Sequence, residues 1–263
     1  MPFTAKLLTL PPWLLFILIN LVFISISLLV FWGITRLLSC KKRCDLNEVA
    51  SPIFNRAGAF FGFLLAFVVV VMWQEYTKAV DNASREGTEA LALYRDLTLY
   101  PDKEQTKGTI KALVDFAHQV VEAEYPAMAQ MKTSQTTEQA LQNLWSSTEK
   151  INPKGRQEEI LYNVILKDLY NLSKLRNERL LELESNLPGV IWGVLIIGAI
   201  VTLVFSTLLG TESILLHALL KSLFVILIAS TFFLIIELDY PFTGNISVRP
   251  VSYIRMLETV PPR

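Results

Sequence analysis

Few side chains of this chain have the types and spacing that enzyme chemistry needs. It contains two histidines, His118 and His217, and neither stands in the spacing of a zinc site or of a base beside a nucleophile. Cys40 and Cys44 have no histidine neighbours in the sequence and make no zinc pattern. No glycine-rich phosphate loop follows a strand, because no strand pattern is evident. We therefore expect no enzyme, no cofactor and no metal site.

One pair of chemically capable residues, His217 and Lys221, lies in an otherwise apolar segment. Their i, i+4 spacing places them on one face of a helix. Two interpretations are open: the pair contacts an ion or a lipid headgroup, or both side chains lie at the membrane interface and extend their polar ends to water.

Four long apolar windows dominate the sequence. Of the 263 residues, 52% are apolar, and the mean hydropathy is +0.42. Each window reaches the roughly 18 to 20 residues that a helix needs to cross a bilayer. The windows are 7–35, 57–74, 185–211 and 213–236, the last interrupted only by Lys221. The sequence therefore predicts an all-α integral membrane protein with four transmembrane helices.

The segment 75–186 has a different character and predicts a helical extramembrane domain. It holds 14 Lys or Arg and 18 Asp or Glu, hence a net charge of −4. Apolar residues recur at three- and four-residue steps in 110–121 and 160–175, and breaks are predicted at Pro101, Pro126, Pro153 and Pro188. The predicted organisation is a first transmembrane helix with a basic cytoplasmic loop (1–56), a second transmembrane helix that continues into the soluble domain (57–74), the helical domain (75–186), a transmembrane hairpin closed at 210–212 (187–238) and a C-terminal tail (239–263).

The second transmembrane helix has two unlike faces at 100° per residue. Small residues on one face let a neighbouring backbone approach closely, as they do on the third helix; they are Gly58, Gly62 and Ala66, with Gly189 and Gly193 on the third helix. The bulky face carries Phe60, Leu64, Phe67 and Val71, with Phe63 at one edge. Bulky apolar side chains can form the constriction of a pore, or they can simply contact lipid and neighbouring helices.

This helix is predicted to continue beyond the membrane. No proline occurs between Pro52 and Pro101, and a helix over that span would be roughly 70 Å long. Glu75 continues the bulky face into solvent, and Asp81 follows further along. In a symmetric oligomer these two carboxylates would form acidic rings, which favour cations.

The distribution of basic residues predicts the orientation. The segment 36–56 carries Arg36, Lys41, Lys42, Arg43 and Arg56. Basic loops stay in the cytoplasm, so 75–186 is predicted on the outer side of the cell membrane, which is the periplasmic side if the cell is a Gram-negative bacterium. The expected partners are the lipid bilayer, further copies of the chain and inorganic ions, with no nucleic acid.

Four separated segments resemble the bestrophin-like family of small bacterial membrane proteins. They are AGAFFGFLLAFVVVVMWQEYTKAVDNASREGTEALALYRDL (57–97), VVEAEYPAMA (120–129), LPGVIWGVLIIGAIVTLVFSTLLG (187–210) and ELDYPFTGNISV (237–248). The resemblance runs over roughly 57–255. It implies kinship with bestrophins, homo-oligomeric ion channels in which the second membrane helix lines a shared pore with a phenylalanine-rich neck. Phe60, Phe63 and Phe67, with Leu64 between them, match that neck.

The sequence departs from bestrophins in two respects. The resemblance implies a cytoplasmic helical domain, whereas the basic segment predicts an outer one. No acidic cluster matches the calcium clasp of animal bestrophins, since Glu237 and Asp239 are only two carboxylates and calcium takes six or more oxygen ligands. Two functions follow: an oligomeric channel with a weak preference for cations over chloride, or a non-conducting scaffold or sensor whose extramembrane helices bind a partner or ligand.

Overall fold

The computed structural model describes residues 8, 10–37, 40–183, 186–210 and 213–260. All regular secondary structure in those residues is helical, so the all-α prediction is confirmed. Among them, four helices are long and apolar enough to span a membrane: α2 (Pro12–Leu37), α3 (Cys40–Leu99), α8 (Gly189–Leu208) and α9 (Ile214–Leu238). The four predicted spans are therefore confirmed. Residues 211 and 212 of the predicted hairpin connection lie outside the described residues.

The chain divides into two compact units. The membrane unit comprises 2–75 and 186–239, and the extramembrane unit comprises 76–185 and 240–263. The sequence treats the C-terminal tail as a separate segment, whereas the structure groups it with the extramembrane helices. The helix α10 (Val251–Thr259) buries Tyr253 and Met256 there, which explains the grouping.

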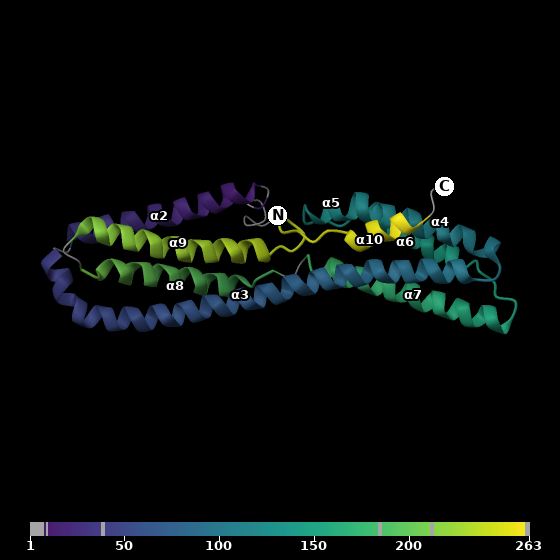
Figure 1. Ribbon diagram of the computed structural model, residues 1–263, viewed down its shortest axis with the longest axis horizontal. Coiled ribbons are helices and arrows are strands. Elements are labelled where there is room, and N and C mark those ends of the chain that lie inside the picture. Colours follow the sequence, from purple (N-terminus) through teal and green to yellow (C-terminus); the bar gives the residue numbers. More distant parts are fainter. Residues whose placement is uncertain (1–7, 9, 38–39, 184–185, 211–212, 261–263) are drawn as a thin grey trace. The chain divides into compact units, whose positions relative to one another are not determined.

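In the membrane unit, α2 lies along α9 (Figure 1). Phe16 and Phe233 form an edge-to-face pair with ring centroids 5.3 Å apart, and Phe54 of α3 meets Phe224 of α9 at 5.9 Å. Asn47 of α3 binds Gly210 in both directions: its Nδ2 donates to the Gly210 carbonyl at 2.9 Å, and its Oδ1 accepts from the Gly210 N–H at 2.8 Å. The first contact joins α2 to α9, and the other two hold α3 against α9 and against the segment that follows α8.

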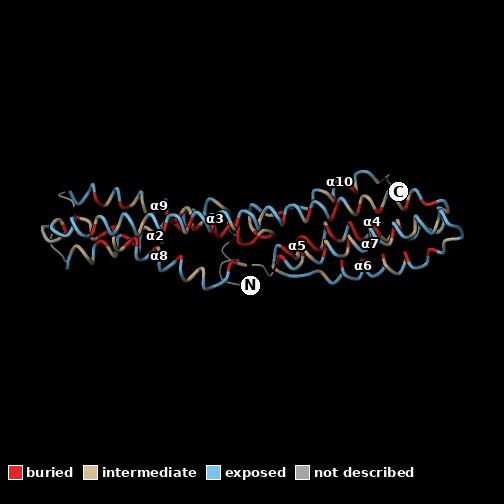
Figure 2. The backbone as a smooth tube through the Cα atoms, turned by 90° about the horizontal axis from the view of Figure 1, so that it is seen from below, coloured by how far each residue is buried: buried red, intermediate tan, exposed pale blue. Residues whose placement is uncertain are grey.

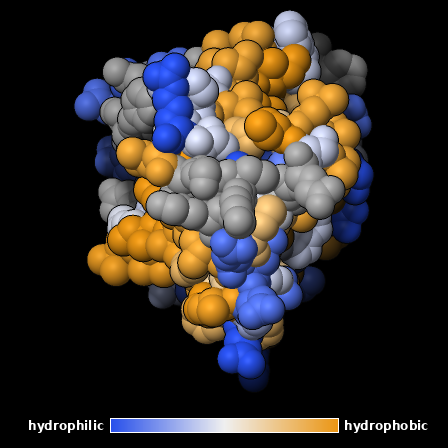
Figure 3. Space-filling model, turned by 90° about the vertical axis from the view of Figure 1, so that its left-hand side faces the viewer, coloured by the Kyte–Doolittle hydropathy of each residue, from blue (hydrophilic) through white to orange (hydrophobic). Residues whose placement is uncertain are grey.

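Much of the outward surface of the membrane unit is apolar, as a bilayer requires. Figure 2 shows exposed residues (pale blue) along the helices of this unit. Figure 3 faces the end at which α3 and α9 begin and shows large apolar areas (orange) on the outer surface. The outward side chains of α9 include Leu215, Leu219, Leu223 and Leu227, which are 57% to 83% exposed.

The helix α3 is longer than the sequence predicts. It spans 60 residues and includes Pro52, so at 1.5 Å per residue it is about 90 Å long. The predicted basic loop at 36–56 is wrong for residues 40–56, which are helical. Pro52 bends the helix rather than ending it, because its ring removes one N–H donor and displaces the preceding turn. Figure 1 shows α3 turning near its start.

The extramembrane unit packs helices around an apolar core, whose buried residues (red) face inward in Figure 2. Besides the second part of α3 it contains α4 (Lys103–Gln119), a π-helical turn (Val120–Glu124), α5 (Tyr125–Met128), α6 (Gln135–Thr148), α7 (Arg156–Leu181) and α10. Leu97, Leu113, Leu144 and Leu169 are each 0% exposed. The breaks predicted at Pro101, Pro153 and Pro188 are confirmed by the helix ends.

The break predicted at Tyr125–Pro126 is wrong. The chain passes through the π-helical turn straight into α5, which ends at Met128. A turn follows, in which Met131 adopts a positive φ of 58°. A π-helical turn bonds i to i−5 and is wider than an α-helical one. The wider turn makes room for the proline ring, so Pro126 does not end the run.

Candidate functional site

The part of α3 in the membrane unit buries one face. Phe61, Leu65, Val68 and Met72 are 5% to 6% exposed, and their i, i+4, i+7, i+11 spacing places them along one side of the helix. Gly198 of α8 lies against this side, because a Cβ on Gly198 would be 2.5 Å from Cδ2 of Phe61. Only glycine permits this approach, and the contact fixes which face of α3 turns inward.

The three predicted neck phenylalanines are turned away from this buried side of α3, whereas Leu64 and Val71 lie at its border. Phe60, Phe63 and Phe67 are 73%, 74% and 60% exposed, and Leu64 and Val71 are half-buried. At 100° per residue, Phe63 lies almost diametrically opposite the buried face. Three phenylalanines exposed on one helix side form an apolar surface that lipid or a second copy of the chain must cover.

The small residues predicted to pack helices have no such neighbours within the chain. A Cβ on Gly58, Gly62, Gly189 or Gly193 would meet nothing within 4 Å beyond its own helix in the described chain, and Ala66 is exposed. Close approach occurs instead at Gly198 and at Gly210, where a Cβ would lie 2.4 Å from the backbone nitrogen of Cys44. The sequence analysis missed both glycines. Close packing at the predicted positions therefore requires another chain.

Charges of both signs follow the phenylalanine face along α3. Glu75 and Asp81 are exposed, and Asp81 forms a surface ion pair with Arg85 at 2.7 Å. Lys78 and Arg85 fall within about 20° of Phe60 at 100° per residue, and both are exposed. The sequence analysis considered only the acidic residues. The nearby basic residues reduce any preference that the carboxylates give to cations.

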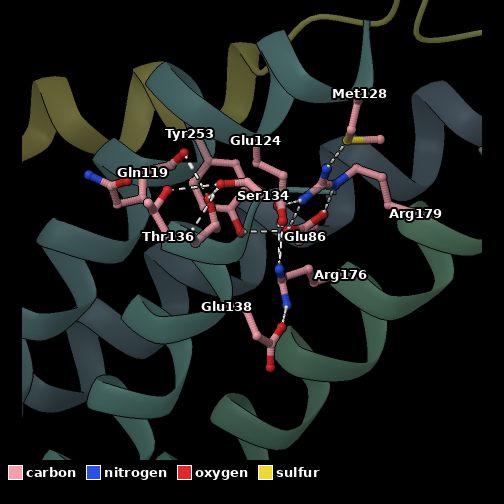
Figure 4. Close-up of polar contacts among 11 residues, drawn as sticks. Glu86, Gln119, Glu124, Met128, Ser134, Thr136, Glu138, Arg176, Arg179 and Tyr253 are labelled. Atoms are coloured by element: carbon pink, nitrogen blue, oxygen red, sulfur yellow. Dashed lines mark hydrogen bonds and ion pairs between the residues drawn. The ribbon is translucent and has the colours of Figure 1, made fainter. Parts of the chain in front are cut away.

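A buried chain of ion pairs crosses the core of the extramembrane unit (Figure 4). Arg179 is fully buried, and its Nη2 donates to Glu86 Oε1 at 3.0 Å and to Glu124 Oε2 at 2.6 Å. Arg176 donates from Nη2 to Glu124 Oε1 at 2.6 Å and from Nη1 to Glu138 Oε2 at 2.7 Å. Glu124 therefore joins two arginines, and the π-helical turn ends at this residue.

The charges of this chain of ion pairs are strongly stabilised. Burial lowers the pKa of Arg179, but the charge and hydrogen bonds of Glu86 and the charge of Glu124 outweigh it, so the pKa lies well above its usual range. Burial raises the pKa of Tyr253, whose hydroxyl donates to Glu86 Oε1 at 2.8 Å and ties α10 to the same group. The arrangement orders the core and offers no reactive group.

The sequence contains a signal for these ion pairs that the analysis did not use. Glu86 follows Ala79 and Ala83 at i, i+4, i+7 in the buried side of α3, and all three are 5% exposed or less. Arg176 and Arg179 likewise extend the buried side of α7 beyond Leu169 and Leu172. Charged residues at core positions of an amphipathic pattern need partners of opposite charge.

Three basic side chains surround Phe31 inside the membrane unit. The rings of Phe31 and His217 are 5.1 Å apart. Lys221 Nζ lies 5.2 Å and Arg43 Cζ 5.9 Å from the Phe31 ring centroid. Arg43, His217 and Lys221 are 2%, 6% and 4% exposed. Of the two interpretations of His217 and Lys221, the one in which both extend to water is therefore wrong, because the surrounding helices enclose both side chains.

In the part of the chain that the structure describes, no group of three or more His, Cys, Asp or Glu side chains is arranged to hold a metal ion.

The chain is similar to a known protein family in sequence and to solved structures in fold. A model of the bestrophin-like domain matches residues 21–253. The fold is similar to a crystal structure of a bacterial bestrophin homolog from Klebsiella pneumoniae that carries one substitution, with a TM-score of 0.67, 15% identity, and 92% of this chain and 96% of that chain covered. Another structure of such a homolog from Klebsiella pneumoniae gives a TM-score of 0.64 at 15% identity, with 93% and 99% covered. A comparison with curated proteins finds no match.

The family match covers most of the chain, and the structural matches cover nearly the whole of both chains. The four apolar helices agree with a protein that crosses the membrane several times. The resemblance found in the sequence is thus confirmed: this chain belongs to the bestrophin-like family.

Proposed function

We propose that the chain forms a homo-oligomeric ion channel in which the Phe60, Phe63 and Phe67 face of α3 surrounds a shared pore. The exposure of these three rings carries the proposal, because the Gly198–Phe61 contact turns them away from their own subunit. Membership in the bestrophin-like family supports an ion channel in general terms.

In this arrangement the phenylalanines form an apolar neck, with Leu64 and Val71 beside them. Rings of apolar side chains gate by excluding water until the pore widens. Gly62 and Ala66 lie beside the phenylalanine face and present no bulk. Such small residues suit the approach of a helix from the neighbouring subunit. One exposed side of α3 would thus serve both the pore and the assembly.

We further propose a weak preference for cations over chloride. Glu75 and Asp81 would form acidic rings at the mouth of the neck, and such rings attract cations. Lys78 and Arg85 share the face and oppose them, and Asp81 is already paired with Arg85. The preference should therefore be small and sensitive to single charge changes.

The proposed location is the bacterial inner membrane, with 36–56 in the cytoplasm and the extramembrane unit outside, as the basic residues indicate. A cysteine introduced at exposed Lys174 in intact cells tests this sidedness with a membrane-impermeant thiol reagent. Labelling supports an outer location. Labelling only after cell lysis would place the unit in the cytoplasm, as the bestrophin resemblance implies.

Ion flux from liposomes tests the channel itself. Purified protein is reconstituted, and the release of K⁺ and of Cl⁻ is followed separately, with a known channel as the positive control. Release above that from empty liposomes supports the proposal. No release of either ion, while the control channel conducts, would refute it.

A sensor or scaffold is the second candidate, and one observation favours it. The extramembrane unit has a cavity of about 870 Å³ between α3, α4 and α10, within the size range of small-molecule sites. Its lining combines Tyr94, Val114 and Leu257 with charged Lys107 and Lys111. This function predicts that Phe60→Ala changes stability or assembly but no ion flux, and that changes on the extramembrane helices abolish recovery of a partner.

A further inference from the structure

Among the residues that the structure describes, no acidic side chain is paired with the basic group formed by Arg43, His217 and Lys221. Lys221 Nζ donates to the Ser27 carbonyl at 3.0 Å and to the Thr207 hydroxyl, and His217 Nε2 donates to the Ser206 carbonyl at 3.0 Å. These acceptors are all neutral. An ammonium group has three N–H donors. Two of those of Lys221 have acceptors, which leaves one N–H without an acceptor among the described residues.

Arg43 is the least satisfied member of the group. Its Nε and Nη1 are buried and have no hydrogen-bond partner among the described residues, and the same is true of the Ser27 hydroxyl. The Phe31 ring lies 5.9 Å from the Arg43 Cζ. A ring face attracts a cation weakly but neither neutralises it nor accepts its hydrogen bonds at full strength. Buried donors of a charged group are costly to leave without acceptors.

No carboxylate is placed to balance these charges in the described residues. The helices α2 and α8 contain no Asp or Glu. The acidic residue of α9, Glu237, lies 16 residues after Lys221, or roughly 24 Å along the helix. Asp45 and Glu48 of α3 are exposed. The side chains of Arg43 and Lys221 are therefore enclosed among apolar and neutral groups of the described chain, where charge is least tolerated.

We propose that this basic group binds one anion, held by Arg43 and Lys221 and reached by the Ser27 hydroxyl. An anion supplies both the missing negative charge and the missing acceptors, and charge-assisted hydrogen bonds of this kind are strong. The group lies where α2 ends and where α3 and α9 begin, and so near one surface of the bilayer. The anion is therefore either inorganic, such as chloride or phosphate, or the phosphate of an anionic lipid headgroup.

Thermal unfolding of the purified full chain in a neutral detergent tests this site. The protein is first depleted of lipid and held in sodium gluconate, and chloride, phosphate or phosphatidylglycerol is then added at constant sodium and ionic strength. A ligand that binds the folded protein raises the unfolding temperature with a saturable dependence on its concentration. We expect a rise of several degrees with at least one of the three probes, and the effective probe identifies the source of the anion.

Substitutions locate the effect. Arg43→Gln and Lys221→Met should abolish the ligand-dependent rise, and Arg43→Lys, which keeps the charge, should retain part of it. Arg56→Gln removes a charge from an exposed position of the same helix and should leave the rise intact. Native mass spectrometry should show a phosphatidylglycerol molecule that the wild type retains and Lys221→Met loses, if the anion is a lipid.

Two results would overturn the proposal. One is a wild-type unfolding temperature that none of the three probes changes. The other is an equal rise in the wild type, Arg43→Gln and Lys221→Met, because the anion would then act elsewhere or through the solvent. Where Arg43→Gln or Lys221→Met fails to fold, the wild-type titration and Arg43→Lys decide the question.

Discussion

Gly198 on α8 lies so close to Phe61 on α3 that a Cβ added to Gly198 would be 2.5 Å from Cδ2 of the ring. The contact orients the long helix. Because Phe61 faces inward, Phe60, Phe63 and Phe67 are left on the outward side. The proposed pore therefore depends on a contact between a glycine and an aromatic ring, neither of which would line that pore.

Replacing Gly198 with alanine should destabilise the membrane unit. The added methyl group would clash with a buried ring, and overpacking of this kind costs about 1–3 kcal/mol. Gly33→Ala on α2 is the matched control, since its Cβ would meet nothing within 4 Å and alanine favours a helix over glycine by about 1 kcal/mol. Thermal unfolding of both variants measures the difference. Equal unfolding temperatures for the two would show that α8 does not press on Phe61.

Removing Arg179 should unfold the extramembrane unit readily. Arg179→Met leaves Glu86 and Glu124 buried without their shared cation, which costs about 3–5 kcal/mol. The unfolding temperature should fall on the order of 10 °C. Lys174→Met on the same helix breaks only the exposed pair with Glu178 at 3.9 Å, and should cost under about 1 kcal/mol. A loss in Arg179→Met no larger than that in Lys174→Met would contradict the role given to the buried ion pairs.

The extramembrane unit should become more stable as the pH falls from 8 to 5. The pKa of Asp168 is raised to about 7, and burial is the largest cause. The next causes are the hydrogen bond with Asp96, the negative charge of Asp96 and the negative charge of Glu89. An unfolded aspartate titrates near pKa 3.9, so between these values the folded state binds a proton that the unfolded state does not. The resulting stability is lost as the pH rises through about 7.

Asp168→Asn should remove this contribution to the pH dependence and raise the unfolding temperature at pH 8. Asp81→Asn, at an exposed position, should keep the wild-type dependence. Unfolding temperatures of the three proteins at several pH values provide the comparison. Parallel curves for the wild type and Asp168→Asn would rule out Asp168 as the source.

Charge changes on the proposed mouth should shift ion selectivity in opposite directions. Glu75→Gln should move the reversal potential in a KCl gradient towards that of chloride, and Lys78→Gln should move it towards that of potassium, because charged rings attract ions of opposite sign. Lys107→Gln, on α4 beside the cavity, serves as a control for a general loss of positive charge. If neither Glu75→Gln nor Lys78→Gln changes the reversal potential, other residues determine the ion selectivity.

The sequence predicts the four spans and the continuous second helix well, because lipid forces every backbone group of a span into a helix and no proline interrupts residues 53–100. It does not predict contacts that join distant segments. Arg179 and Glu86 are 93 residues apart, and no spacing rule relates them. The sequence analysis treated Pro52 and Pro126 as helix boundaries, but Pro52 lies within a bent helix and Pro126 follows a π-helical turn.

The candidate site was predicted only in part. The types and spacing of Phe60, Phe63 and Phe67 identified one face of the helix, but the face turned towards the subunit depends on Gly198, far away in the sequence. The sequence placed Arg43 in a cytoplasmic loop because basic loops stay in the cytoplasm, and for Lys221 it left a position at the membrane interface as one of two interpretations. The burial of both side chains depends on their packing against Phe31 of α2, a contact between segments that are separate in the sequence.

Thiol modification during current recording tests the proposed pore most directly. In a Cys40→Ser, Cys44→Ser background, cysteine replaces either Phe67 or its neighbour Ala66, which lies about 100° away around α3. A water-soluble, charged thiol reagent is then added to channels in a planar bilayer. We predict that the current through Phe67→Cys channels changes abruptly and that Ala66→Cys channels are unaffected. A change confined to Ala66→Cys would contradict the assignment and place the small-residue face at the pore axis.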